Sequence, residues 1–160
     1  MTFSFDEAEN GHLEITQMLL DIGAGVDAST EFGCTALMFA AKRGHADVVQ
    51  ALLLHKASIN MSTHKSHHTA MMFAAESGHL PIVKLLVEAG ANKHAVNRYF
   101  FVSFLFGSRR IDVGFFPLRH SQNALMLATA KGQERVAKYL QASGCEVKRI
   151  FHPFVTIQDG

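Results

Sequence analysis

The chain has 160 residues, a length that suits one hydrophobic core or one short repeat array. Its 15 basic and 14 acidic residues give a net charge of +1, which provides no electrostatic reason to expect nucleic acid or an anionic membrane as a partner. With 48% hydrophobic and 18% charged residues, the composition is typical of a soluble globular chain.

Cysteine content and apolar runs give an expectation for the compartment. Cys34 and Cys145 match no metal or redox spacing, which favours reduced thiols in the cytoplasm or nucleus. The first residues have neither a basic stretch nor an apolar stretch, so we expect no signal peptide. The longest apolar run, from Tyr99 to Phe106, is shorter than the roughly 20 residues of a membrane-spanning helix, so we expect no membrane span.

Four stretches repeat one pattern along the chain. They read ENGHLEITQMLLDIGAGVD from Glu9, KRGHADVVQALLLHKASIN from Lys42 and ESGHLPIVKLLVEAGANKH from Glu76. The fourth, AKGQERVAKYLQASGCEVK from Ala130, has Gln133 in place of His. Such self-similarity at a fixed period predicts a repeat architecture.

The sequences TALMFAA, TAMMFAA and NALMLAT precede the last three copies. Thr2 to Thr35 is 33 residues, Thr35 to Thr69 is 34, and Thr69 to Asn123 is 54. We therefore predict one domain over residues 1–148, with an insertion before the last unit and a C-terminal tail. The predicted units are about 1–30, 31–63, 64–97 and 119–148, the insertion is 98–118, and the tail is 149–160.

Each unit is predicted to contain two short helices. Thr35 suits a helix N-cap, Leu37, Ala40 and Ala41 form an i, i+3, i+4 apolar face, and Gly44 suits the end of the helix. The second helix places an apolar stripe on one side, made by Val48, Val49, Leu52 and Leu53. Because two such helices cannot bury both stripes alone, the units must stack. The expected fold is an all-α solenoid of about four helix-turn-helix repeats.

The insertion has a different composition from its surroundings. The stretch from Arg98 to Arg119 holds six of the 13 Phe residues. Three interpretations stay open: a strap packed on the solenoid, a finger that touches a partner or a membrane, or a retained intron or alternative exon without a function. Closing a longer loop costs only about 0.6 kcal/mol per doubling of its length, so loop closure does not decide between them.

The repeated pattern G-x-T-A-L-M-x-A-A-x-x-G-H-x-x-x-V-x-x-L-L-x-x-G-A resembles the ankyrin repeat, over the whole chain except the insertion and the tail. Where that family usually has T-P-L-H, this chain has T-A-L-M. The turn Gly is kept at Gly33 but is replaced by His67 and Ser121, and Lys56 replaces the Gly after the second helix of its unit. The methionines in the His position are Met38, Met72 and Met126.

No catalytic motif was found in the sequence. Phosphate-binding loops, nucleophile elbows, zinc-protease helices and C-x-x-C pairs are all absent, so we expect no enzyme activity and no cofactor. HKSHH, from His64 to His68, lacks a nearby Cys or carboxylate, so we expect a polar turn with solvated His and no metal site. His12, His45 and His79 are expected to bond backbone across a turn.

The resemblance implies that a partner protein binds the concave face, through hairpin tips and the ends of the inner helices. Phe32 is the expected anchor, since exposed aromatic residues dominate interfaces; the alternative is that it folds back on its own repeat. Lys42, Arg43 and Lys131 form an acidic-partner site or are solvated charges. The matching positions are Glu9, Asn10, Glu31, Phe32, Cys34, Lys42, Arg43, Lys65, Ser66, His68, Glu76, Ser77, Arg119, His120, Gln122, Ala130 and Lys131.

The resemblance also implies a modification. Some ankyrin-like repeats are hydroxylated at a hairpin Asn that has a Leu eight residues earlier. Asn60 with Leu52 has that spacing, so Asn60 is a candidate hydroxylation site.

The expected function is a non-catalytic scaffold or adaptor, monomeric, in the cytoplasm or nucleus, that binds another protein. The alternative is a targeting or regulatory fragment of a larger multidomain enzyme or channel. Nucleic-acid binding is disfavoured by the net charge of +1.

Overall fold

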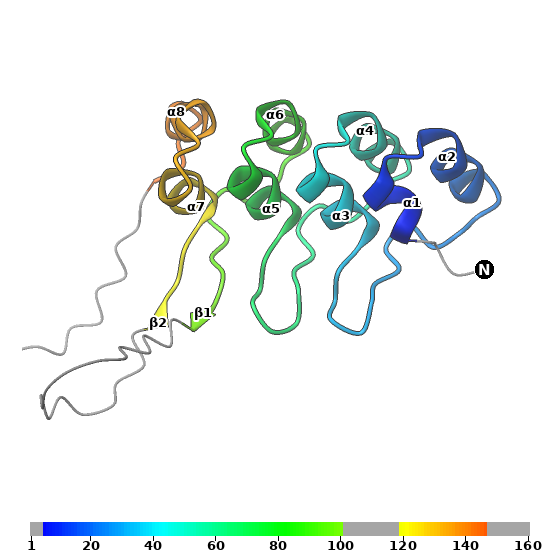
Figure 1. Cartoon of the computed structure of the whole chain (residues 1–160), viewed down its shortest axis with the longest axis horizontal. Helices are drawn as coiled ribbons and strands as arrows, with labels where there is room; N and C mark the ends of the chain where they lie inside the picture. Colours follow the sequence, from blue (N-terminus) through cyan, green and yellow to red (C-terminus); the bar gives the residue numbers. More distant parts are fainter. Residues whose placement is uncertain (1–4, 101–118, 147–160) are drawn as a thin grey trace, which may run out of the picture.

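The computed structural model describes residues 5–100 and 119–146, which form four helix pairs stacked in a row (Figure 1). Each pair falls within one predicted unit. An inner helix and an outer helix make up each pair, so the stack has two layers. The inner helices are α1 (Phe5–Asn10), α3 (Ala36–Arg43), α5 (Ala70–Ser77) and α7 (Ala124–Ala130). The outer helices are α2 (Leu13–Asp21), α4 (Ala46–Leu54), α6 (Leu80–Glu88) and α8 (Glu134–Ala142).

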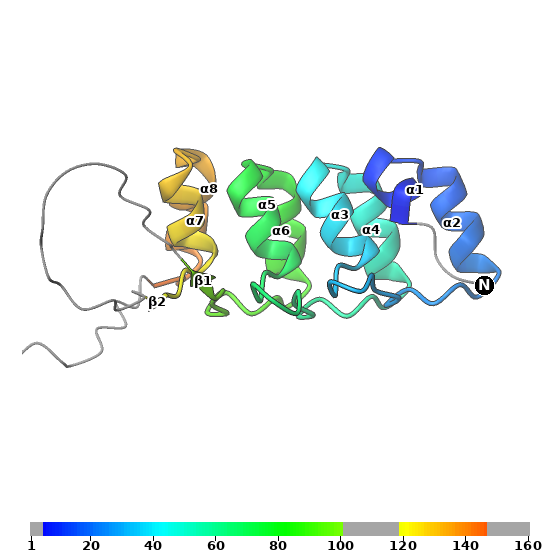
Figure 2. The ribbon, with the colours of Figure 1, turned by 60° about the horizontal axis from the view of Figure 1, so that its bottom comes forward.

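The loops that join successive pairs gather along one edge of the stack (Figure 2). In the described residues, regular strand structure is limited to β1 (Tyr99–Phe100) and β2 (Arg119–His120), which pair antiparallel. The predicted all-α solenoid of four repeats is therefore confirmed, with a short strand pair added at the third loop.

The starts of the inner helices are capped as the sequence predicts. The side chains of Thr35, Thr69 and Asn123 each accept a hydrogen bond from the backbone N–H three residues further on, at 3.4, 3.4 and 3.0 Å. The inner helices then pack through small residues that are all buried, which lets neighbouring helices approach closely. These are Ala36, Ala40, Ala41, Ala70, Ala74, Ala75, Ala124 and Ala128.

The turns after the first three inner helices contact the next unit, because their glycines lie against a side chain of that unit. Gly44 ends α3 with φ +93°, and a Cβ atom there would lie 2.7 Å from the His79 ring. The His79 ring nitrogen Nε2 lies 3.2 Å from the carbonyl of Lys42, and Nε2 of His45 lies 2.9 Å from the carbonyl of Glu9. His45 and His79 thus bond backbone, but in the preceding unit rather than in their own turn. The expectation is wrong for His12, whose Nδ1 lies 2.6 Å from the Glu7 carboxylate.

Two residues other than glycine adopt the left-handed conformation. Lys56 has φ +63° where three other units have Gly, and His67 has φ +53° at the position of Gly33. A left-handed conformation costs a side-chain-bearing residue about 1–2 kcal/mol. The turn geometry is therefore imposed by the repeat, even where the sequence lacks the residue that suits it best.

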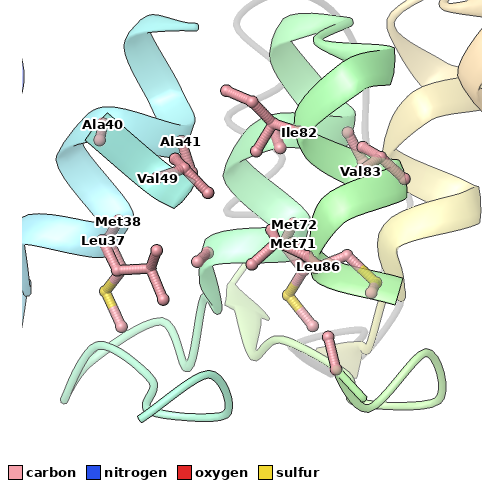
Figure 3. Close-up of a cluster of buried hydrophobic side chains, with 14 of the residues drawn as sticks. Leu37, Met38, Ala40, Ala41, Val49, Met71, Met72, Ile82, Val83 and Leu86 are labelled. Atoms are coloured by element: carbon pink, nitrogen blue, oxygen red, sulfur yellow. The ribbon is translucent and has the colours of Figure 1, made fainter. Parts of the chain in front are cut away.

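The hydrophobic core runs continuously between the two layers (Figure 3). Met38 and Met72, in the position where the family pattern has His, are buried in the first turns of α3 and α5. Ile82, Val83 and Leu86 of α6 are also buried and lie in the same cluster. The flexible methionine side chains thus belong to the hydrophobic core, as their apolar character predicts.

Candidate protein-binding surface

Three loops form a row of hairpins at the edge of the stack. Isolated bridges close the first two, between Ser29 and Thr35 and between Ser62 and Thr69, and the pair of β1 and β2 closes the third. Neighbouring hairpins are also linked, because the His64 N–H donates to the Phe32 carbonyl at 3.0 Å. In the same way, the Arg98 N–H donates to the Ser66 carbonyl at 2.8 Å. The hairpins are therefore a connected platform, which can present side chains in fixed positions.

The first tip carries an exposed aromatic ring. Phe32 is 54% exposed, so the alternative that it folds back on its own repeat is wrong. The ammonium group of Lys65, from the second tip, lies 5.8 Å from the centre of this ring, within the range of a cation–π contact. Glu31 is exposed beside it and Cys34 is half-buried. Phe32 and Lys65 thus form one surface feature that spans two hairpins.

The second hairpin departs from the predicted polar turn with solvated His. His64 is exposed and its ring bonds the Glu31 carbonyl, but His68 is only 8% exposed. The expectation that His68 is solvated is wrong, because its ring packs against Phe73 with centroids 5.3 Å apart and lies 3.3 Å from the side-chain nitrogen of Asn97. His68 therefore supports the surface from below.

Burial lowers the pKa of His68 below its ordinary value of 6.5, and the nearby Glu76 carboxylate and a Ser66 backbone bond offset this in part. We expect stability to fall as the pH drops below 6.5, since the unfolded chain then binds more protons than the native one. Urea unfolding at about pH 7.5 and about pH 5.5 measures the effect, which should be smaller in His68→Gln. The matched control is His55→Gln, an exposed position; equal pH dependence in all three proteins would contradict the burial of His68.

The inner-helix ends form a rim of paired charges. Arg43 bonds Glu9 through Nε at 2.9 Å, and Lys131 lies 3.2 Å from the Glu76 carboxylate. Lys42 lies 6.0 Å from the centre of the Phe73 ring. Each pair joins neighbouring units, so these cations are not a free basic patch. Because exposed pairs contribute only about 0–1 kcal/mol, a partner can displace them at little cost. The other predicted rim positions, Asn10, Ser77 and Ala130, are exposed.

A side-chain hydrogen bond, the clamp, closes each hairpin at its base. Thr30 Oγ1 accepts from the Cys34 N–H at 3.2 Å, and Thr63 Oγ1 accepts from the His68 N–H at 3.0 Å. At the same place in the third hairpin, the Asn97 side-chain oxygen accepts from the Gln122 N–H at 2.8 Å. The clamp residue Asn97 was not predicted from the sequence, although its place in the repeat, 34 residues after Thr63, could have revealed it.

The third hairpin also carries the predicted insertion. The Asn97 N–H donates to the Gln122 carbonyl at 2.9 Å, and β1 and β2 continue the pairing with Tyr99 opposite His120. Of the predicted site residues here, Gln122 is half-buried, and Arg119 and His120 form β2. Residues 101–118 and the tail lie outside the described residues, so the three interpretations of the insertion stay predictions.

The remaining sequence predictions concern Asn60, the two cysteines, a metal site and a membrane span. Asn60 is exposed and its side-chain oxygen accepts from the Asn92 N–H at 2.8 Å; its hydroxylation stays a prediction. Cys34 and Cys145 form no disulfide, and burial raises the pKa of Cys145. In the described ranges, no group of three or more His, Cys, Asp or Glu residues could hold a metal ion. No helix of those ranges is long and apolar enough to cross a membrane.

Comparisons with known proteins agree with this architecture. A family model described as ankyrin repeats, in three copies, matches residues 5–97. A probable E3 ubiquitin-protein ligase of rice, XBOS33, is 42% identical over 62 residues, which is 39% of this chain. The E3 ubiquitin-protein ligase XBAT33 of Arabidopsis thaliana is 40% identical over 62 residues, again 39% of the chain. The match spans only 12% of the length of each ligase. Four stacked helix pairs, their linked hairpins and the family match lead to one conclusion: the chain belongs to the ankyrin-repeat family, whose repeats bind other proteins.

Proposed function

We propose that this protein is a non-catalytic scaffold or adaptor that binds a partner protein through its hairpin tips and the ends of its inner helices. The observation that carries the proposal is the pair of Phe32 and Lys65. The aromatic ring is more than half exposed on a platform whose backbone is held by hydrogen bonds. An aromatic side chain held in place loses little entropy on binding, which is why such residues dominate interfaces.

The chemistry of this surface favours a particular kind of partner. The Phe32 ring offers apolar contact, and the Lys65 ammonium beside it offers a charge to a carboxylate. On the rim, Arg43 and Lys131 already bond carboxylates of this chain, which a partner can replace. We therefore propose a partner segment with an apolar side chain flanked by acidic residues. The protein is proposed to act as a monomer in the cytoplasm or nucleus, where its two free thiols stay reduced.

Affinity capture from a cell lysate, read by mass spectrometry, tests this proposal. Phe32→Ala should weaken capture of the main partner by about thirtyfold, the loss of a binding hot spot of about 2 kcal/mol. Leu54→Ala is the matched control, because Leu54 is an exposed apolar residue of the outer layer. If both variants retain the partner equally, the first hairpin tip is not the anchor.

A third variant separates the insertion from the hairpins. Replacing Phe101 to Leu118 with Asn-Gly removes the insertion but supplies a two-residue hairpin turn, so β1 and β2 can still pair. We expect this deletion to capture the same partner as the full chain. A folded deletion variant that loses the partner would assign binding to the insertion and overturn the proposal.

A second candidate function follows from the two relatives named as ubiquitin ligases. In it, this array is the recognition part of a larger enzyme assembly whose catalytic part lies outside these 160 residues. Incubating the chain with ubiquitin, activating enzyme, conjugating enzyme and ATP distinguishes the proposals. Ubiquitin-chain formation by the chain alone would contradict a non-catalytic role, and capture of a ligase subunit from the lysate would favour the second candidate. Cooperative urea unfolding of a monomer would favour a finished module.

A further inference from the structure

The outer helix of the first unit has a stripe of exposed apolar side chains. Ile15, Met18 and Ile22 are 44%, 65% and 62% exposed, and their spacing of three and four residues puts them on one side of α2 and its C-terminal cap. We call these three residues the end stripe. Large apolar side chains that gather on one exposed face are characteristic of interaction surfaces.

The positions equivalent to Ile15 in the other units are buried. Aligning the units on their Gly-His or Gly-Gln pairs matches Ile15 with Val48, Ile82 and Val136, which are 0%, 1% and 1% exposed. Each of those residues belongs to an outer helix with another outer helix before it in the row, whereas α2 is the first (Figure 1). At Ile15 the end stripe therefore occupies the side of the outer helix that a preceding unit covers in the rest of this protein, whereas the positions equivalent to Ile22 are exposed or half-buried.

At the other end of the stack, the last outer helix α8 has small and polar side chains on its exposed side. Each outer helix also has a side that faces the following unit. In the first three units the residues on that side are buried: Thr16, Val49 and Val83. In the fourth unit this position is Ala137, and the next turn of α8 has the exposed Gln141. The last outer helix therefore has no large apolar residue at these two positions of its exposed side, whereas the first outer helix has the apolar end stripe on its exposed side.

The charges around the end stripe favour a basic occupant. Residues 5–30 contain six Asp or Glu residues and no Lys or Arg, although the whole chain has a net charge of +1. Glu14 and Asp21 are exposed on α2 next to the stripe. Negative charges beside an apolar surface attract a partner with positive charges beside its own apolar surface.

A second copy of the chain fits this face poorly. Two end stripes in contact would bring Glu14 and Asp21 of both copies close together, and like charges repel. The last unit of another copy would place Ala137 and Gln141 where a large apolar residue is needed. From these observations we propose that the end stripe binds an amphipathic helix of another protein, with an apolar side flanked by Lys or Arg. The helix lies along α2 as the outer helix of a preceding unit would.

This inference is independent of the proposed function, because α2 belongs to the outer layer and the hairpins extend beyond the inner one (Figure 1). The probe is a fluorescein-labelled peptide of Leu and Lys, about 18 residues long so that it forms a helix, with Leu on one side. Fluorescence anisotropy measures its binding to the full chain. A scrambled peptide of the same composition, which has no apolar side, is the peptide control.

Replacing all three residues of the end stripe by Gln keeps the charge and removes the apolar surface. We expect this triple variant to bind the peptide about tenfold more weakly, and Leu54→Gln, the matched control, to bind within about twofold of the original chain. The scrambled peptide should also bind about tenfold more weakly. Equal binding by the triple variant or by the scrambled peptide would show attraction by charge alone and overturn the proposal.

Two further measurements keep the result decisive. If circular dichroism shows that the triple variant is unfolded, Glu14→Gln/Asp21→Asn replaces it, since both carboxylates are exposed. This charge variant should weaken peptide binding several-fold, and unchanged binding would contradict the proposal. Light scattering of the original chain tests the second copy as occupant. A dimer that depends on the end stripe, together with no peptide binding, would assign the face to self-association.

Discussion

Leu86→Ala should lower the free energy of unfolding by about 2–5 kcal/mol. Leu86 is fully buried in α6, where it packs in the cluster between the two layers (Figure 3). The substitution removes apolar contacts and leaves a cavity that rigid helices on both sides cannot fill. Urea unfolding followed by circular dichroism measures the change.

Leu54→Ala is the matched control for Leu86→Ala. Leu54 has the same side chain in the neighbouring outer helix but is 75% exposed, so its removal should change the free energy of unfolding by less than about 0.5 kcal/mol. A small loss for Leu86→Ala, equal to that of the control, would mean that α6 does not belong to the core.

Asn97→Ala is expected to loosen the fourth unit from the rest of the array. Asn97 is fully buried, its oxygen accepts from the Gln122 N–H, and its nitrogen lies against the His68 ring. Without it, the buried His68 ring loses a partner, at about 1–3 kcal/mol, and the half-buried Gln122 N–H loses its acceptor. Hydrogen exchange should then become faster in α7 and α8 and stay unchanged in α3 and α4, because repeat stability is a sum over neighbouring units.

Asn97→Thr is the informative comparison for Asn97→Ala. Thr30 and Thr63 perform the same clamp in the first two hairpins, so a threonine hydroxyl can accept from the Gln122 N–H. Exchange in α7 should therefore lie closer to that of the original chain than in Asn97→Ala. Equal acceleration in both variants would mean that the clamp is not what Asn97 provides.

Local patterns in the sequence were sufficient to predict the helix pairs. Thr35 caps α3 and Gly44 ends it, and the Ala pairs between them are buried, as their spacing indicates. These features are contained within a single unit, so the sequence carries them directly. The exposed position of Phe32 was one of two alternatives that the sequence left open.

Features that depend on contacts between residues far apart in the chain could not be predicted in the same way. HKSHH reads as a solvated turn, but His68 is buried by Phe73 and by Asn97, 29 residues further along the chain. Ile15 has the same local pattern as the buried Val48, and only its place at the start of the row exposes it. Burial in a solenoid thus depends on the neighbouring units, which a local pattern does not contain.

The hairpin clamps have a consequence for engineering the protein. Because Asn97 and Gln122 close the third hairpin at its base, a change in the number of residues beyond them leaves both closing residues in place. Each doubling of that length costs only about 0.6 kcal/mol in closure entropy. The third hairpin is therefore a suitable position for displaying a foreign peptide, such as an epitope tag or a protease site, without disturbing the four stacked units.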